Sequence, residues 1–204
     1  VAVLRVDDGK ANALSHAVLD ALHAGFDRAQ EDSAKAVAVV GRPGRFSAGF
    51  DLSVMSQGPE AVRELVGKGA GLALRIFEWP TPVVLGVTGH ALAMGAVLCL
   101  AADERIGSAG AYKLGLNEVA IKMTLPDFAL VLAADRLSRR HLTRARSAGW
   151  LPGWPGRREA GFAADPAGAR GQRIAFHAIQ SRPGLGLEHE PHHVGLARGC
   201  AQID

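Results

Sequence analysis

The chain has 204 residues, of which 48% are hydrophobic and 21% charged, and its formal net charge is +3. This length and composition suit one globular domain with a sizeable core. No apolar run reaches the roughly 20 residues of a membrane-spanning helix, and the basic residues do not cluster with aromatic ones as in nucleic-acid-binding proteins. We therefore expect a protein that binds neither membrane nor nucleic acid.

The two cysteines, Cys99 and Cys200, have no metal-like spacing, and Cys99 lies in an apolar run. These features predict a reduced, cytoplasmic protein without structural disulfides. No signal-peptide pattern opens the chain. Because Val1 is not a start methionine, we expect an incomplete or processed N-terminus.

Residues 1 to about 144 alternate between strand-like and helix-like patterns. A strand is predicted at 1–6, a turn at 7–10, and a helix that begins after an N-cap at Ser15 and continues to about residue 30. The later predicted elements are strands at 36–40, 83–87 and 105–106, and helices at 60–78, 95–102 and 128–137. Repeated alternation of this kind predicts an α/β fold.

The pattern changes after about Ala145. Residues 145–204 are rich in Gly, Pro, Arg and His, show no sustained period, and contain no lysine. We therefore predict a core at 1–144 and an atypical tail at 145–204, which we interpret as the product of a reading-frame change near Ala145. The alternative is a genuine but divergent C-terminal extension. Translating the coding DNA in its other two frames would distinguish the two.

Two segments rich in small residues each follow a predicted strand. The first, 44–52, reads Gly-Arg-Phe-Ser-Ala-Gly-Phe-Asp-Leu, and the second, 88–96, reads Thr-Gly-His-Ala-Leu-Ala-Met-Gly-Ala. Small residues let a ligand approach the backbone, and a helix N-terminus offers unpaired N–H groups. Taken alone, the first segment is better explained as an ordinary strand-to-helix turn, and the second is a weak signal because small residues are common at helix starts.

Together and in this order, the segments resemble the crotonase family, the enoyl-CoA hydratase/isomerase group. In that family Phe-Ser-Ala-Gly-x-Asp-Leu is one half of an oxyanion hole, and Gly-x-Ala-x-Gly-Gly-Gly is the other half, followed by an Asp that Asp103 matches. Residues 12–14, Asn-Ala-Leu, match a family element close to coenzyme A. The resemblance implies a crotonase-like ββα spiral, although the family's C-terminal helices are not recognisable here. It also implies a homotrimer or a dimer of trimers, if the C-terminus permits.

The resemblance assigns roles residue by residue. It makes the backbone N–H groups of Phe50 and Met94 the oxyanion donors for an acyl-CoA thioester. Met94 replaces a family glycine, so its long side chain is expected to narrow the acyl pocket. The residues expected to contact substrate are Ala48, Gly49, Phe50, Asp51, Leu52, Met94 and Gly95. No metal or separate cofactor is expected, because coenzyme A enters as part of the substrate.

One carboxylate is present where the family's hydratases use two. Val97 occupies the position of the first, and Glu118, in Gly-Leu-Asn-Glu, supplies the second. A single base that moves an α-proton to the γ-carbon suits double-bond isomerisation better than efficient hydration, so the resemblance implies that Glu118 is the acid/base. A surface carboxylate at a strand end is the ordinary alternative. Replacing Val97 with Glu is expected to raise hydration.

Other polar candidates have simpler explanations. His90 is expected to be a packing residue, and Asp51 is expected to structure its turn. The metal-ligating side chains of the tail, His189, His192, His193 and Cys200, have no supporting pattern, so no metal site is predicted.

Three hypotheses of different classes remain from the sequence. They are an acyl-CoA enzyme that uses Glu118, a CoA-thioester binder with vestigial activity, and an altered product that folds in part. The second is suggested by Val97 and by Asp127-Phe128, which replace the family's paired glycines after Pro126.

Overall fold

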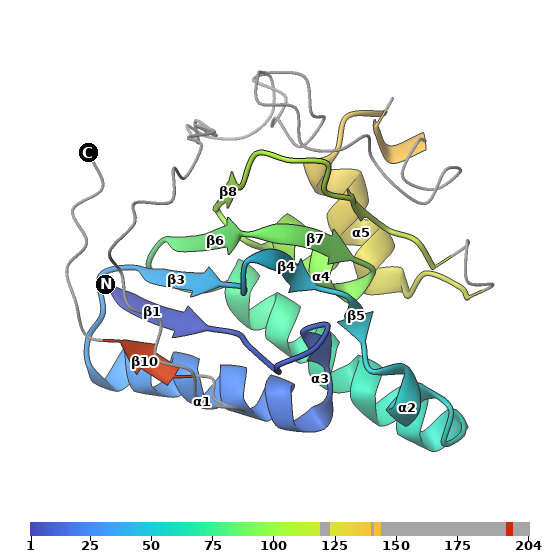
Figure 1. The fold of residues 1–204 in the computed structure, drawn as a ribbon, viewed down its shortest axis with the longest axis horizontal. Coiled ribbons are helices and arrows are strands. Elements are labelled where there is room, and N and C mark those ends of the chain that lie inside the picture. Colours follow the sequence, from blue (N-terminus) through green and yellow to red (C-terminus); the bar gives the residue numbers. More distant parts are fainter. Residues whose placement is uncertain (119–122, 140, 144–194, 198–204) are drawn as a thin grey trace.

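The computed structural model describes residues 1–118, 123–139, 141–143 and 195–197. Its main layer is a five-stranded sheet in the order β10-β1-β3-β6-β8 (Figure 1). The parallel strands of this sheet are β1 (Ala2–Arg5), β3 (Val37–Val40), β6 (Val83–Val87) and β8 (Glu104–Gly107). The fifth strand, β10 (Gly195–Ala197), pairs antiparallel with β1. Leu4, Val37 and Leu85 are fully buried, as expected of strands in a covered parallel sheet.

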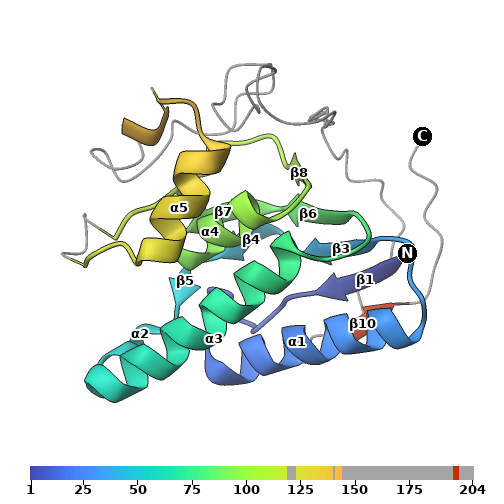
Figure 2. The same ribbon diagram turned by 180° about the vertical axis from the view of Figure 1, so that it is seen from behind.

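Two long helices pack against each other, α1 (His16–Glu31) and α3 (Pro59–Phe77) (Figure 2). The Ser15 hydroxyl caps α1 as predicted and accepts the N–H of Val18 at 3.3 Å. Proline at the first position of α3 starts a helix well, because its missing N–H is not needed there. The sequence pattern placed both helices correctly to within two residues.

A second layer of shorter strands was not predicted. One parallel sheet contains β4 (Gly44–Ser47), β7 (Gly89–Leu92) and β9 (Leu114–Gly115), and another contains β2 (Ala13–Leu14) and β5 (Gly49–Phe50). Both small-residue segments were predicted to be turns, but each also contains a short strand: β4 and β5 lie in the first segment and β7 in the second. A Cβ on Gly89 would lie 1.8 Å from the carbonyl carbon of Gly44, so glycine permits the close pairing of β4 with β7. Strands this short show no hydrophobic period in the sequence.

The described fold also contains the helices α2 (Leu52–Met55), α4 (Met94–Ala101) and α5 (Asp127–Arg136). Every residue of α4 is buried, and α4 contacts α3, α5 and the shorter strands. The side chain of Arg105 on β8 donates to the carbonyl of Cys99 on α4 at 2.8 Å, so this helix also contacts the main sheet. No helix in the described part of the chain has the length and apolar character needed to cross a membrane.

The predicted tail, 145–204, lies outside the described residues except for β10, which the sequence pattern did not indicate.

Candidate active site

Gly49 brings the two small-residue segments together. Its φ of +94° is strained for any other residue, and a Cβ there would lie 2.7 Å from the Cβ of Ala93. The same atom would lie 3.4 Å from the backbone nitrogen of Met94. The first residue of β5 therefore lies directly against the N-terminus of α4.

Each segment contributes a main-chain N–H group at this junction. Met94 is the first residue of α4, so its N–H has no acceptor within the helix. On the other segment, the N–H of Asp51 donates to the carbonyl of Leu14 at 3.2 Å. Because successive N–H groups of a strand face opposite edges, that of Phe50 is turned away from β2.

A buried polar chain fixes the turn before Phe50. The Ser47 hydroxyl accepts the N–H of Gly49 at 3.1 Å and donates to the carbonyl of Asn12 at 2.8 Å. The Asn12 side chain is fully buried and donates to the carbonyls of Val6 and Phe46 at 2.8 and 3.2 Å. Ser47 and Asn12 therefore tie this turn to the end of the main sheet.

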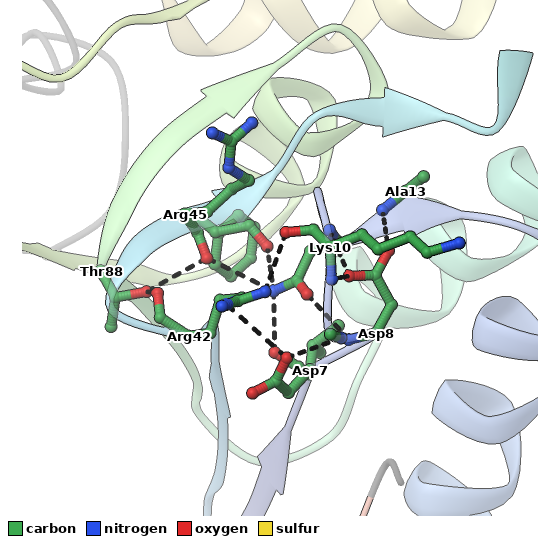
Figure 3. Close-up of polar contacts among 11 residues, drawn as sticks. Asp7, Asp8, Lys10, Ala13, Arg42, Arg45 and Thr88 are labelled. Atoms are coloured by element: carbon green, nitrogen blue, oxygen red, sulfur yellow. Dashed lines mark hydrogen bonds and ion pairs between the residues drawn. The ribbon is translucent and has the colours of Figure 1, made fainter. Parts of the chain in front are cut away.

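The loop that carries Asn12 is itself well bonded (Figure 3). The Asp8 carboxylate accepts the N–H groups of Lys10, Asn12 and Ala13 at 2.7, 2.8 and 2.9 Å. Burial opposes ionisation of Asp8, but these bonds outweigh it and lower its pKa below the ordinary value. The guanidinium of Arg42 donates to the carbonyl of Lys10, which holds the loop against the β3–β4 connection.

A cavity of about 360 Å³ lies beside the junction. Its apolar wall comes from α2, α3 and the residues that follow Glu118: Leu52, Met55, Pro59, Val62, Val66, Met123 and Pro126. Four of the residues expected from the sequence line it: Ala48, Phe50, Leu52 and Glu118. The sequence did not predict that residues of α3 or Asn117 would line the cavity. The helix was foreseen, but its pattern did not show which face would meet a ligand.

The other expected contacts lie outside the cavity wall. The Met94 side chain is 2% exposed, and its Cε lies 3.4 Å from where a Cβ on Gly69 would stand. It therefore packs toward α3, and contrary to expectation it does not narrow the cavity. Gly49 and Gly95 lie behind the wall: a Cβ on Gly95 would meet the Cβ of Ser47 at 2.7 Å.

Asp51 and His90 have the structural surroundings expected of them. The Asp51 carboxylate caps α2, accepting the N–H and the hydroxyl of Ser53 at 2.9 and 2.7 Å. The Nδ1 atom of His90 accepts the N–H of Lys113 at 2.8 Å, and its ring meets Tyr112 edge to face.

Strand β9 positions Glu118. The N–H of Ala93 donates to the carbonyl of Gly115 at 2.9 Å, and Leu116 is anchored in the core with 2% exposure. Glu118 is 7% exposed, and its Oε2 atom is buried without a hydrogen-bond partner in the described structure. Burial raises the pKa of this carboxyl group, against a smaller opposing effect of its own backbone N–H.

The raised pKa makes stability depend on pH. A carboxyl group whose pKa is higher in the folded chain contributes most below its ordinary value of 4.5, and that contribution is lost as pH rises through the folded pKa. The side chain of Glu118→Gln cannot ionise. We therefore expect the free energy of unfolding of this variant, relative to that of wild type, to increase as the pH rises from acid to neutral. Urea unfolding of both proteins across this range measures the difference. A difference in unfolding free energy that stays constant with pH would contradict this prediction.

Val97 does not line the cavity. It is 1% exposed within α4, so a carboxylate there would be buried without a partner. We therefore expect Val97→Glu to lower the free energy of unfolding by about 2–4 kcal/mol, rather than simply to restore a hydratase pair. Val97→Gln, similar in size but uncharged, should cost less. Equal unfolding midpoints for the two variants would exclude a charge effect.

Within the described residues, no group of three or more His, Cys, Asp or Glu side chains could hold a metal ion. The tail residues His189, His192, His193 and Cys200 lie outside those residues.

The fold and the paired loops define a crotonase-type α/β protein. Residues 1–143 match the family model described as enoyl-CoA hydratase/isomerase, and the chain belongs to that family. A curated relative from Bacillus subtilis, described as a probable enoyl-CoA hydratase, is 35% identical over 63% of this chain. This chain spans 50% of that relative's length.

Solved structures agree with this assignment. A family protein from Pseudomonas syringae is 42% identical with a TM-score of 0.71, covering 74% of this chain and 65% of its own. A protein of Mycobacterium tuberculosis, described both as an enoyl-CoA isomerase and as a probable enoyl-CoA hydratase, is 39% identical with a TM-score of 0.72, covering 78% of this chain and 70% of its own. Relatives therefore include proteins described as hydratases and as isomerases.

Proposed function

We propose that this protein binds an acyl-CoA thioester and moves a proton on its acyl chain with Glu118, in the manner of an enoyl-CoA isomerase. The observation that carries the proposal is the buried carboxyl group of Glu118, a wall residue of a largely apolar cavity, whose Oε2 atom has no hydrogen-bond partner among the described residues. The raised pKa makes the Glu118 carboxylate a stronger base than an ordinary one, and its protonated form can later return the proton.

The thioester oxygen would lie between the N–H groups of Phe50 and Met94. The contact between Gly49 and Ala93 supports this, because it brings the two donor segments together without a side chain between them. Charge that develops on the oxygen when an α-proton leaves is stabilised by such fixed donors. The dipole of α4 adds to the effect, since its positive end faces the same point.

The proton transfer balances with one carboxylate. Glu118 takes a proton from C2 of a 3-enoyl thioester, and the electron pair moves onto the carbonyl oxygen as an enolate. The protonated Glu118 then returns the proton to C4, and the double bond is left between C2 and C3. No second carboxylate is needed, which agrees with a valine at position 97.

The test is conversion of 3-hexenoyl-CoA to the 2-enoyl isomer by the whole chain, with product identified by chromatography. In deuterated water, exchange at C2 should accompany turnover, because a carboxyl proton equilibrates with solvent. Hydration of 2-hexenoyl-CoA at a higher rate than isomerisation would contradict the isomerase assignment.

A second candidate is a CoA-thioester binder with vestigial activity, favoured by the buried Val97. It predicts saturable thioester binding with neither turnover nor exchange at C2.

A further inference from the structure

The strand that carries Phe50 is paired with a very short partner. In the described structure β5 and β2 form a two-stranded sheet of their own, with two residues in each strand. Pairing of this extent is marginal by itself, so β2 must be held from outside the sheet. Helix α1 follows β2 after Ser15 and fixes one end of it, and the loop of residues 7–12 fixes the other end.

Asp8 closes that loop with three bonds to main-chain groups. One carboxylate oxygen accepts the N–H groups of Lys10 and Asn12, and the other accepts the N–H of Ala13, the first residue of β2 (Figure 3). The N–H of Asp8 in turn donates to the side-chain oxygen of Asn12 at 3.0 Å. Burial opposes ionisation of Asp8, but the main-chain bonds lower its pKa below the ordinary value, so both oxygens accept at neutral pH.

The same loop reaches β5 by a second path. The carbonyl of Asn12 accepts the buried hydroxyl of Ser47, and that hydroxyl accepts the N–H of Gly49, the residue before Phe50. Asn12 has a φ of +51°, in the left-handed region that residues other than glycine adopt less readily. The bonds to the Asp8 carboxylate hold Asn12 in this conformation and so keep its carbonyl turned toward Ser47.

We propose that Asp8 is a positioning residue that fixes the direction of the Phe50 N–H toward a bound thioester. The inference rests on the proposed function, in which this N–H is one of two donors to the thioester oxygen. Asp8 is not among the residues that line the cavity, so it acts through β2 and through Asn12. Because a hydrogen bond weakens steeply as its angle departs from linearity, a small rotation of the donor reduces polarisation of the thioester.

An asparagine at this position cannot replace the carboxylate. Three N–H groups converge on Asp8, and the NH₂ group of an amide has no lone pair to offer Ala13. Asp8→Asn therefore keeps the size of the side chain and loses at least one of the three bonds.

Infrared difference spectroscopy of the whole chain with hexanoyl-CoA, labelled with ¹³C at the thioester carbonyl, tests the proposal. In wild type the carbonyl stretch should move to lower frequency on binding, and in Asp8→Asn it should move less. Only folded protein contributes the bound band, so a loss of stability alone would lower its intensity and leave its frequency unchanged. For 3-hexenoyl-CoA, kcat of Asp8→Asn should fall by about 10- to 100-fold while KM stays within a few-fold.

Asp7→Asn is the matched control. It makes the same chemical change in the same loop, where the Asp7 carboxylate accepts the N–H of Gly9 at 2.9 Å and lies 3.7 Å from Nε of Arg42. The contacts of this carboxylate in the described structure do not include Asn12 or β2. The variant should keep the wild-type carbonyl frequency and kcat.

The outcomes separate the role of Asp8 from the proposed function. A wild-type carbonyl frequency in Asp8→Asn, or an equal change in Asp7→Asn, would overturn the role of Asp8 and leave the thioester site standing. Failure of wild type to bind hexanoyl-CoA, or binding without a change in frequency, would overturn the proposed function as well. Should Asp8→Asn not fold, Asp8→Ser, whose single hydroxyl cannot accept all three N–H groups, takes its place in the same comparison.

Discussion

Glu118→Gln should lower kcat for a 3-enoyl-CoA by about 100- to 10,000-fold and change thioester affinity by no more than a few-fold. The substitution keeps the shape of the side chain and the main-chain donors, but it removes the group that carries the proton. Steady-state kinetics and equilibrium binding on the same preparation separate kcat from affinity. In wild type, kcat/KM should rise with pH through a pKa above 4.5, because the base must be ionised and burial raises its pKa.

Glu104→Gln is the matched control. Glu104 is a second partly buried glutamate whose pKa burial also raises, but it lies on β8 outside the cavity wall. The Glu104→Gln variant should turn over substrate at the wild-type rate. Undiminished turnover by Glu118→Gln would refute the acid/base role of Glu118.

Gly49→Ala should lower turnover by about 100-fold, an effect comparable to the loss of one oxyanion donor. The added Cβ would meet the Cβ of Ala93 at 2.7 Å and would hold an L residue at a φ of +94°. Relief of that contact moves Phe50 away from Met94, which separates the two proposed donors. The folded state should also lose about 1–3 kcal/mol.

Gly67→Ala makes the same chemical change on α3, where a Cβ meets nothing within 4 Å. It should leave turnover unchanged and raise stability by about 0.5–1 kcal/mol, because alanine is the better helix former. Turnover of Gly49→Ala within a few-fold of wild type would show that the spacing of the two loops does not govern catalysis.

Local sequence signals predicted the larger elements, and the resemblance to the crotonase family predicted several cavity residues. The Ser15 cap and the two prolines before Val83, Pro80 and Pro82, mark helix and strand boundaries through the conformations they favour or exclude. The orientation of Met94 was not predictable, because it depends on Gly69, a residue of another helix 25 positions earlier in the chain. Asn117 gave no signal either, since a buried acceptor without a partner is visible only when its surroundings are known.

The short strands were missed for a related reason. Residues 89–92 pair with 44–47 only because both backbones can approach closely, and no periodicity records such an approach. The resemblance to the crotonase family identified these residues by their chemistry but did not indicate their secondary structure.

Ala93 has a φ of +49° and a ψ of −124°, a backbone conformation that glycine adopts far more readily than alanine. Holding alanine there costs about 1–3 kcal/mol of local strain, which the surrounding packing must offset. The strain resides in the residue before Met94, whose backbone nitrogen would lie 3.4 Å from a Cβ on Gly49. A glycine at position 93 would relieve this strain and raise the free energy of unfolding. The same backbone freedom would leave the orientation of the Met94 N–H less fixed.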